Sequence, residues 1–184
     1  MTTKNRTYDE FTTAEGRIVK PFLVEKDQIV QTRDGRKVGR EDFHGTLIFA
    51  KSDPSVQGLV QIIASIVNAE WPQGAQDFKY QVLNGVLMDG DVYHAGVARQ
   101  SAEKAVKVEW QRGHYLIKAH SQFQPAMFAN GHGDGPLDEV TAKRLFVSGC
   151  YGHFCIVPSA YDGTPGPRGI PPGVTLYLNS VLWT

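Results

Sequence analysis

The stretch DPSVQGLVQIIASIVNAEWP, residues 53–72, decides the fold prediction, because it is the clearest helix in a chain of short apolar runs. Asp53 is a good helix N-cap, Pro54 suits the first helical position, and Trp71-Pro72 ends the pattern. Apolar residues recur at the spacing of one helix face, at Val56, Leu59, Val60, Ile63, Ile66 and Val67. Because residues 56–69 carry no charge, we expect this helix to be well buried.

Strands are predicted on both sides of this helix, where apolar runs lie between glycine and proline residues. They cover residues 16–24, 28–33, 44–51, 106–110, 114–121, 145–157 and 174–183. Pro21 indicates an edge or a bulge in the first strand, and Asp34-Gly35 is a favoured hairpin dipeptide. A weaker helix is expected over 76–84, a loop over 130–135, and one or two helical turns over 138–144.

These elements predict a mainly β fold with an inserted helix, an OB-fold-like five-stranded barrel with one well-buried helix and long loops. A chain of 184 residues is the size of one domain, so residues 16–184 are expected to form it. The polar segment 1–15 is expected to be mobile. Residues 163–173 contain four prolines and four glycines and predict a long mobile connection.

The charge balance argues at first against nucleic acid, because 19 basic residues face 19 acidic ones. The distribution is uneven, however. Residues 99–123 contain five basic residues and only two acidic ones, which makes a modest basic patch. No run approaches the roughly 18 apolar residues of a membrane span, and the N-terminus has no signal-peptide pattern, so we expect an intracellular protein. Cys150 and Cys155 are expected to be reduced thiols.

Two predicted strands carry candidate binding residues. Alternation over 114–121 places His114, Lys118 and His120 on one face, with Leu116 among them. This face is either a binding strip or an ordinary solvated surface, and spacing alone favours the second. In the later strand, Tyr151 and His153 share a face opposite Cys150, Phe154 and Ile156, while Gly149 and Gly152 leave room for a flat group. Tyr151 is either a ring for stacking on bases or part of the core.

Catalysis and metal binding are weak alternatives. Cys150 with His153 or His114 suggests a thiol nucleophile, but alternation directs Cys150 inward and no nucleophile turn follows. The cysteine spacing does not match a zinc site, and no phosphate-binding or dinucleotide motif is present. We expect no catalytic residues, no metal and no cofactor.

Five segments in order resemble one known family. They are HGTLIFAKSD (44–53), the apolar helix, GHYLIKAHS (113–121), SGCYG (148–152) and LNSV (178–181). Together they are similar to the phage single-stranded DNA-binding proteins of OB-fold type, formerly a phage domain of unknown function, over residues 16–183. The resemblance implies sequence-independent binding of single-stranded DNA in phage DNA replication, recombination or repair, in the host cytoplasm. It singles out Lys51, Asp53, Tyr115, Ser121 and residues 148–151.

The expected nucleic-acid-binding residues combine this resemblance with the basic and aromatic pattern. They are Lys51, Arg99, Lys107, Trp110, Arg112, His114, Tyr115, Lys118, His120, Phe123, Tyr151, His153 and Arg168. Proteins of this role commonly end in an acidic tail that recruits replication proteins, and we expect that such a tail was removed from this chain. The alternatives are a general DNA binder that also takes duplex, and a non-enzymatic protein–protein module of virion or assembly type.

Overall fold

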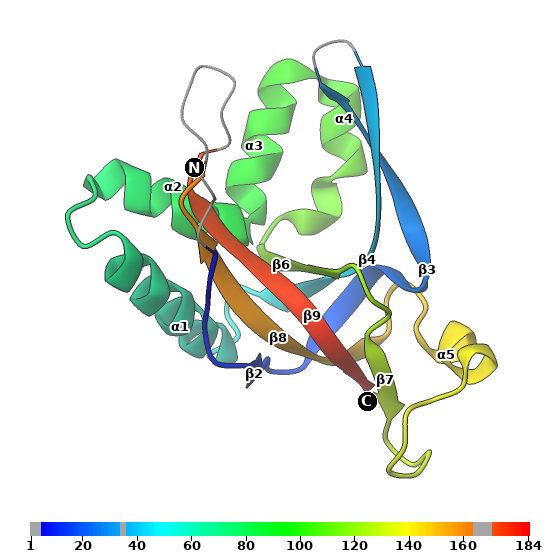
Figure 1. Ribbon diagram of the computed structural model, residues 1–184. Helices are drawn as coiled ribbons and strands as arrows, with labels where there is room; N and C mark the ends of the chain where they lie inside the picture. Colours follow the sequence, from blue (N-terminus) through cyan, green and yellow to red (C-terminus); the bar gives the residue numbers. More distant parts are fainter. Residues whose placement is uncertain (1–4, 34–35, 164–170) are drawn as a thin grey trace. The chain divides into compact units, whose positions relative to one another are not determined.

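The computed structural model describes residues 5–33, 36–163 and 171–184 (Figure 1). The chain forms two compact units. The first unit comprises residues 1–8, 48–117 and 158–175, and the second comprises residues 9–47, 118–157 and 176–184.

The strands of the described residues are β1 Asn5–Thr7, β2 Phe11–Thr12, β3 Gly16–Arg33, β4 Arg36–Ala50, β5 Leu87–Asp89, β6 His114–Ser121, β7 Ala126–Ala129, β8 Tyr151–Tyr161 and β9 Gly173–Trp183. The helices are α1 Ser55–Glu70, α2 Gln76–Val86, α3 Gly90–Gln100, α4 Ala102–Lys107, the 3₁₀ turn η1 Glu109–Gln111 and α5 Glu139–Leu145.

Strand pairing closes a five-stranded ring. The hydrogen-bonded order is β1-β8-β3-β4-β6-β9-β7, and β8 also pairs with β9. Strands β8, β3, β4, β6 and β9 therefore form a closed barrel, in which β6 and β9 run parallel. The fold is mainly β with an OB-like barrel, which confirms the predicted fold class.

Helix α1 of the first unit is amphipathic. Its buried residues are Val56, Leu59, Ile63, Ile66 and Val67, as the spacing predicts. The opposite face is solvated, since Ile62 is exposed, so the absence of charge over 56–69 does not mean burial on all sides. Asp53 accepts hydrogen bonds from the Ser55 amide and hydroxyl, and Trp71 caps the other end. Helix α2 packs on α1 (Figure 1).

The predicted strand over 106–110 is wrong. Ser101 accepts a hydrogen bond from the Lys104 amide and caps α4, so residues 102–107 are helical. The alternation at Val106 and Val108 does not indicate an inward face, because Val106 is 76% exposed. Helix α3 precedes this segment, and its start is capped by Asp89, which accepts from the Asp91 and Val92 amides. Nothing in the sequence pattern predicts α3 or β5.

The core of the second unit includes residues of β3, β4, β8 and β9. Ile18, Leu47, Phe154 and Ile156 are fully buried there. Residues 16–24 and 28–33 belong to one continuous strand, β3, and the strand predicted over 44–51 extends back to residue 36 as β4. Lys20 has a φ of 49°, so the backbone of β3 departs from strand geometry directly before Pro21, where a bulge or an edge is predicted. The Asp34-Gly35 dipeptide lies outside the described residues.

Strand β8 begins later than predicted. Helix α5 runs to Leu145, in agreement with the helical turns expected over 138–144, and Gly149 has a φ of 104° that only glycine adopts readily. The chain therefore turns before Tyr151, and Cys150 precedes the strand instead of sharing a strand face with Phe154 and Ile156. The predicted strand 145–157 is wrong over its first six residues for this reason.

The segment 1–15 contains two strands. Asn5 pairs with Tyr161 of β8 in the first unit, and Phe11 pairs with Ile156 in the second. Arg6 contacts the carboxylates of Glu70 and Asp162. Mobility of this segment and a single domain over 16–184 stay predictions.

Candidate nucleic-acid interface

Trp110 is a predicted binding residue that is exposed on the first unit, where Tyr80 and Tyr93 are exposed as well. Its indole N–H donates to the carbonyl oxygen of Lys107 at 3.0 Å, while 42% of the residue remains accessible. The 3₁₀ turn η1, and not a strand, presents it. Its hydrogen-bond donor is satisfied within the protein, and the accessible part of the side chain is open to a ligand.

Two predicted cations beside Trp110 already have acidic partners. Lys107 contacts Glu103 at 3.0 Å, and Arg112 contacts Glu109 at 2.8 Å. The hydrogen bond between Arg112 and Glu109 raises the pKa of Arg112 above its ordinary value. The same bond lowers the pKa of Glu109. His94 also lies 2.7 Å from Glu109. The charge available to a phosphate here is smaller than the sequence count indicates.

Lys51 is held by two carboxylates. Its Nζ lies 2.7 Å from Asp89 and 2.6 Å from Asp91, and 5.3 Å from the centre of the Tyr115 ring. Partial burial acts to lower the pKa of Lys51, but the hydrogen bonds to both carboxylates outweigh it and raise the pKa. Asp91 also accepts the amide of Gly113. This network joins the start of α3 to the start of β6.

Other predicted residues of the first unit are spread over its surface. Arg99 is exposed in the last turn of α3 and has no ion pair among the described residues. His114 is half-buried, and its Nδ1 lies 2.7 Å from the carbonyl oxygen of Arg112. Arg168 lies outside the described residues.

The second unit also presents exposed rings, and two of them, Tyr151 and Phe123, are predicted binding residues. Tyr151 stands at the start of β8 with 52% of its surface accessible, so it is not a core residue. His153 follows on the same face, and its Nδ1 lies 2.9 Å from the carbonyl oxygen of Thr13. Phe123, in the turn after β6, is 81% exposed, and its amide donates to the Ser121 hydroxyl. An apolar ring so exposed has no packing function.

The predicted polar strip on β6 is only partly solvated. Lys118 is exposed and has no ion pair within the described part of the chain. Leu116, expected on the same solvated face, is buried, as is Ile117, so this part of the strand is covered on both faces. His120 packs edge-on against Tyr177 and lies 3.8 Å from the buried carboxylate of Asp42.

Arg17 is a residue that sequence reasoning missed. It pairs in register with Tyr151 across β3 and β8, and it is exposed. It lies far outside the basic segment 99–123, and its neighbourhood depends on strand register, which composition does not reveal.

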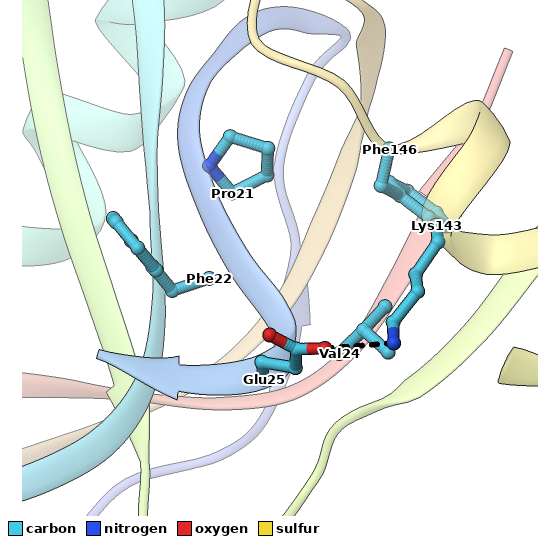
Figure 2. Close-up of a pocket in the computed structure, with 6 residues that line it drawn as sticks. All are labelled: Pro21, Phe22, Val24, Glu25, Lys143 and Phe146. Atoms are coloured by element: carbon cyan, nitrogen blue, oxygen red, sulfur yellow. Dashed lines mark ion pairs between the residues drawn. The ribbon is translucent and has the colours of Figure 1, made fainter.

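A pocket of about 300 Å³ lies elsewhere on the second unit (Figure 2). It is lined by Pro21, Phe22, Val24, Glu25, Lys143 and Phe146. Lys143 bridges Glu25 at 2.7 Å and Glu139 at 2.8 Å. With its cation matched by two carboxylates, the pocket offers no surplus positive charge for a phosphate.

Neither cysteine is set up as a nucleophile. Burial raises the pKa of the Cys150 and Cys155 thiols, which disfavours the nucleophilic thiolate. Among the described residues, no group of three or more His, Cys, Asp or Glu side chains is placed to hold a metal ion. None of the helices in the described part of the chain has the length and apolar composition of a membrane span.

The fold resembles those of phage single-stranded DNA-binding proteins. The protein from bacteriophage Enc34 in complex with ssDNA matches with a TM-score of 0.59 and 17% identity, over 95% of this chain and 85% of that chain. Its C-terminal truncation gives a TM-score of 0.60 and 16% identity, over 95% and 84% of the two chains. The gp2.5 protein of bacteriophage T7, also a single-stranded DNA-binding protein, gives 0.52 and 13%, over 99% and 86%. No family model and no curated protein matches the sequence.

Proposed function

We propose that this chain binds single-stranded DNA without sequence preference and acts in phage DNA replication, recombination or repair in the host cytoplasm. The observation that carries the proposal is the exposure of Trp110, Phe123 and Tyr151 at the surface of an OB-like fold. The likeness to the Enc34 protein, whose structure was solved in complex with ssDNA, supports it. Rings stack on any base, which is why binding of this kind tolerates all sequences.

The phosphates would be bound by exposed cations that are not already paired with a carboxylate. Arg99 in the first unit and Lys118 in the second are exposed and carry no ion pair within the described residues. Lys107 and Arg112 would have to exchange Glu103 and Glu109 for phosphate. Such an exchange adds little to the free energy of binding, because it replaces one exposed ion pair by another and each such pair contributes only about 0–1 kcal/mol. Binding would therefore depend more on rings than on charge, in keeping with the zero net charge of the chain.

The test is a titration of fluorescein-labelled oligothymidine and of a matched duplex, each at low and moderate salt. We expect micromolar or tighter binding to the single strand, a clear preference over duplex, and loss of affinity as salt rises because counterions are released. Equal binding to both nucleic acids would indicate a general DNA binder. No binding to either at low salt would exclude nucleic acid as the ligand.

A protein–protein module is the second candidate function, favoured by one observation. Val92 and Val106 are exposed on the packed helices α3 and α4, and neither side chain has a polar atom to offer a phosphate. Replacing both valines by serine would leave DNA affinity unchanged if DNA is the only ligand. A chain that binds no DNA and loses self-association on this change would support the module.

A further inference from the structure

We propose that Arg17 and Tyr151 form one nucleotide-binding subsite on the second unit, in which the Tyr151 ring stacks on a base and the Arg17 guanidinium binds an adjacent phosphate. This inference rests on the proposed function and names a site for it. It adds Arg17, whose position in the sequence gives no sign of such a role.

Strand register brings the two side chains together. Strands β3 and β8 are antiparallel, with Gly16 opposite Gly152 and Arg17 opposite Tyr151. Directly opposed residues project from the same face of a sheet and are close neighbours. Ile18, next along β3, is fully buried, so alternation directs Arg17 away from the core. Tyr151 is exposed on the same face.

Gly149 leaves space for the guanidinium. A Cβ atom added at Gly149 would lie 3.2 Å from Nη2 and 3.6 Å from Nε of Arg17, so the guanidinium lies directly against this glycine. The turn is held by backbone hydrogen bonds of 2.7 Å from Gly149 to Ile18 and from Ile18 to Cys150. Any other residue at 149 would place its Cβ against the guanidinium and would have to adopt an unfavourable φ of 104°.

The charge of Arg17 is not matched within the described residues. No carboxylate there forms an ion pair with it, in contrast to Lys51, Lys107, Arg112 and Lys143. A planar guanidinium offers five donors in a geometry suited to phosphate oxygens. No ring or cation of the described residues stacks on Tyr151. Both groups are therefore available to a ligand that carries a flat base and an anionic phosphate together.

The experiment compares Arg17→Ala with Arg144→Ala, which removes an exposed arginine of α5 that has no ion pair among the described residues. Binding of labelled oligothymidine is measured over a range of salt. Loss of one phosphate contact should reduce the slope of log K against log salt by about 0.7. We expect this change for Arg17→Ala and none for Arg144→Ala. Thermal unfolding of each variant checks that the fold is retained.

The stacking half of the subsite has its own readout. An oligothymidine containing 5-iodouracil should crosslink to Tyr151 on irradiation, as mapped by mass spectrometry, and Arg17→Ala should reduce the yield at equal saturation. Tyr151→Ala should weaken binding by about five- to tenfold. The double variant should lose less than the product of the single losses, because the two residues hold one nucleotide.

The outcomes separate this inference from the proposed function. Binding by the unaltered chain with an unchanged salt slope in Arg17→Ala, and no crosslink at Tyr151, would overturn the subsite alone. Absence of binding by the unaltered chain would overturn the proposed function and the subsite with it.

Discussion

The indole N–H of Trp110 donates a hydrogen bond to the backbone carbonyl oxygen of Lys107, three residues earlier, at 3.0 Å. This bond orients the ring at the end of α4 and leaves much of it accessible. A ring that is oriented before binding loses little conformational freedom when a base stacks on it. Trp110 is thus prepared for stacking by its own local structure.

We therefore expect Trp110→Ala to weaken binding of single-stranded DNA by about tenfold, because stacking on one ring contributes about 1–3 kcal/mol. Trp110→Phe keeps a ring but loses the hydrogen bond, so its loss should be smaller. Fluorescence anisotropy of labelled oligothymidine measures both. Val106→Ala, which changes an exposed residue of the preceding helix α4, is the matched control. Unchanged affinity of Trp110→Ala would remove this residue from the interface.

Lys51 should contribute more to stability than to binding. Lys51→Met leaves Asp89 and Asp91 without their shared cation, and we expect a loss of about 1 kcal/mol in the free energy of unfolding, allowing for the screening of a partly exposed network. Urea unfolding measures this loss. The salt slope of DNA binding should not change. A slope reduced without loss of stability would instead support the sequence-based prediction that Lys51 contacts phosphate.

Two glycines of α3 should respond in opposite directions to the same substitution. A Cβ at Gly90 would lie 1.8 Å from the backbone oxygen of Gln111, so Gly90→Ala must displace backbone and should cost about 3 kcal/mol or more. Nothing lies within 4 Å of a Cβ at Gly96, so Gly96→Ala should stabilise the helix by about 0.5–1 kcal/mol. Urea unfolding of the two variants tests this. Similar stability of the two would contradict the packing of α3 on η1.

Tyr8 should make stability depend on pH in the alkaline range. Burial, together with the hydrogen bond and charge of Glu70, raises the pKa of Tyr8 to about 12 from 10.0. Because the folded state holds the proton more tightly, this contribution is complete below pH 10 and is lost as pH rises through about 12. Tyr8→Phe should flatten the fall of unfolding free energy in that window.

The control for this pH effect is Tyr80→Phe, which changes an exposed tyrosine of α2 in the same unit. It should keep the alkaline fall of the parent. If Tyr8→Phe and the parent lose stability in parallel between about pH 9 and pH 12, the contact between Tyr8 and Glu70 does not persist in solution.

Much of the secondary structure follows from local patterns. The face of α1, the alternation of Phe154 and Ile156 in β8 and the turns of α5 were all predictable, because each depends on residues a few positions apart. The prediction of a strand over 106–110 is wrong. The pattern of Val106 and Trp110 fits a strand as well as it fits a helix, and the cap at Ser101 decides for a helix.

The candidate site was predictable in kind but not in detail. The aromatic residues Trp110, Phe123 and Tyr151 are exposed, as a binding role requires, although the sequence left Tyr151 open between surface and core. The basic count over 99–123 overstates the available charge, because Lys107 and Arg112 have acidic partners three or four residues away. Such helical pairs become visible only when the segment is known to be helical.

By itself, the sequence determined the amphipathic helix, most of the strands and the number of aromatic and basic side chains, because periodicity and composition are properties of neighbouring residues. Tertiary structure alone decided which of these groups a ligand can reach. It joined Lys51 to Asp89 across 38 positions, and it set Arg17 opposite Tyr151 through the register of β3 and β8. Register and ion pairing between distant segments depend on how the whole chain packs, so no local pattern contains them.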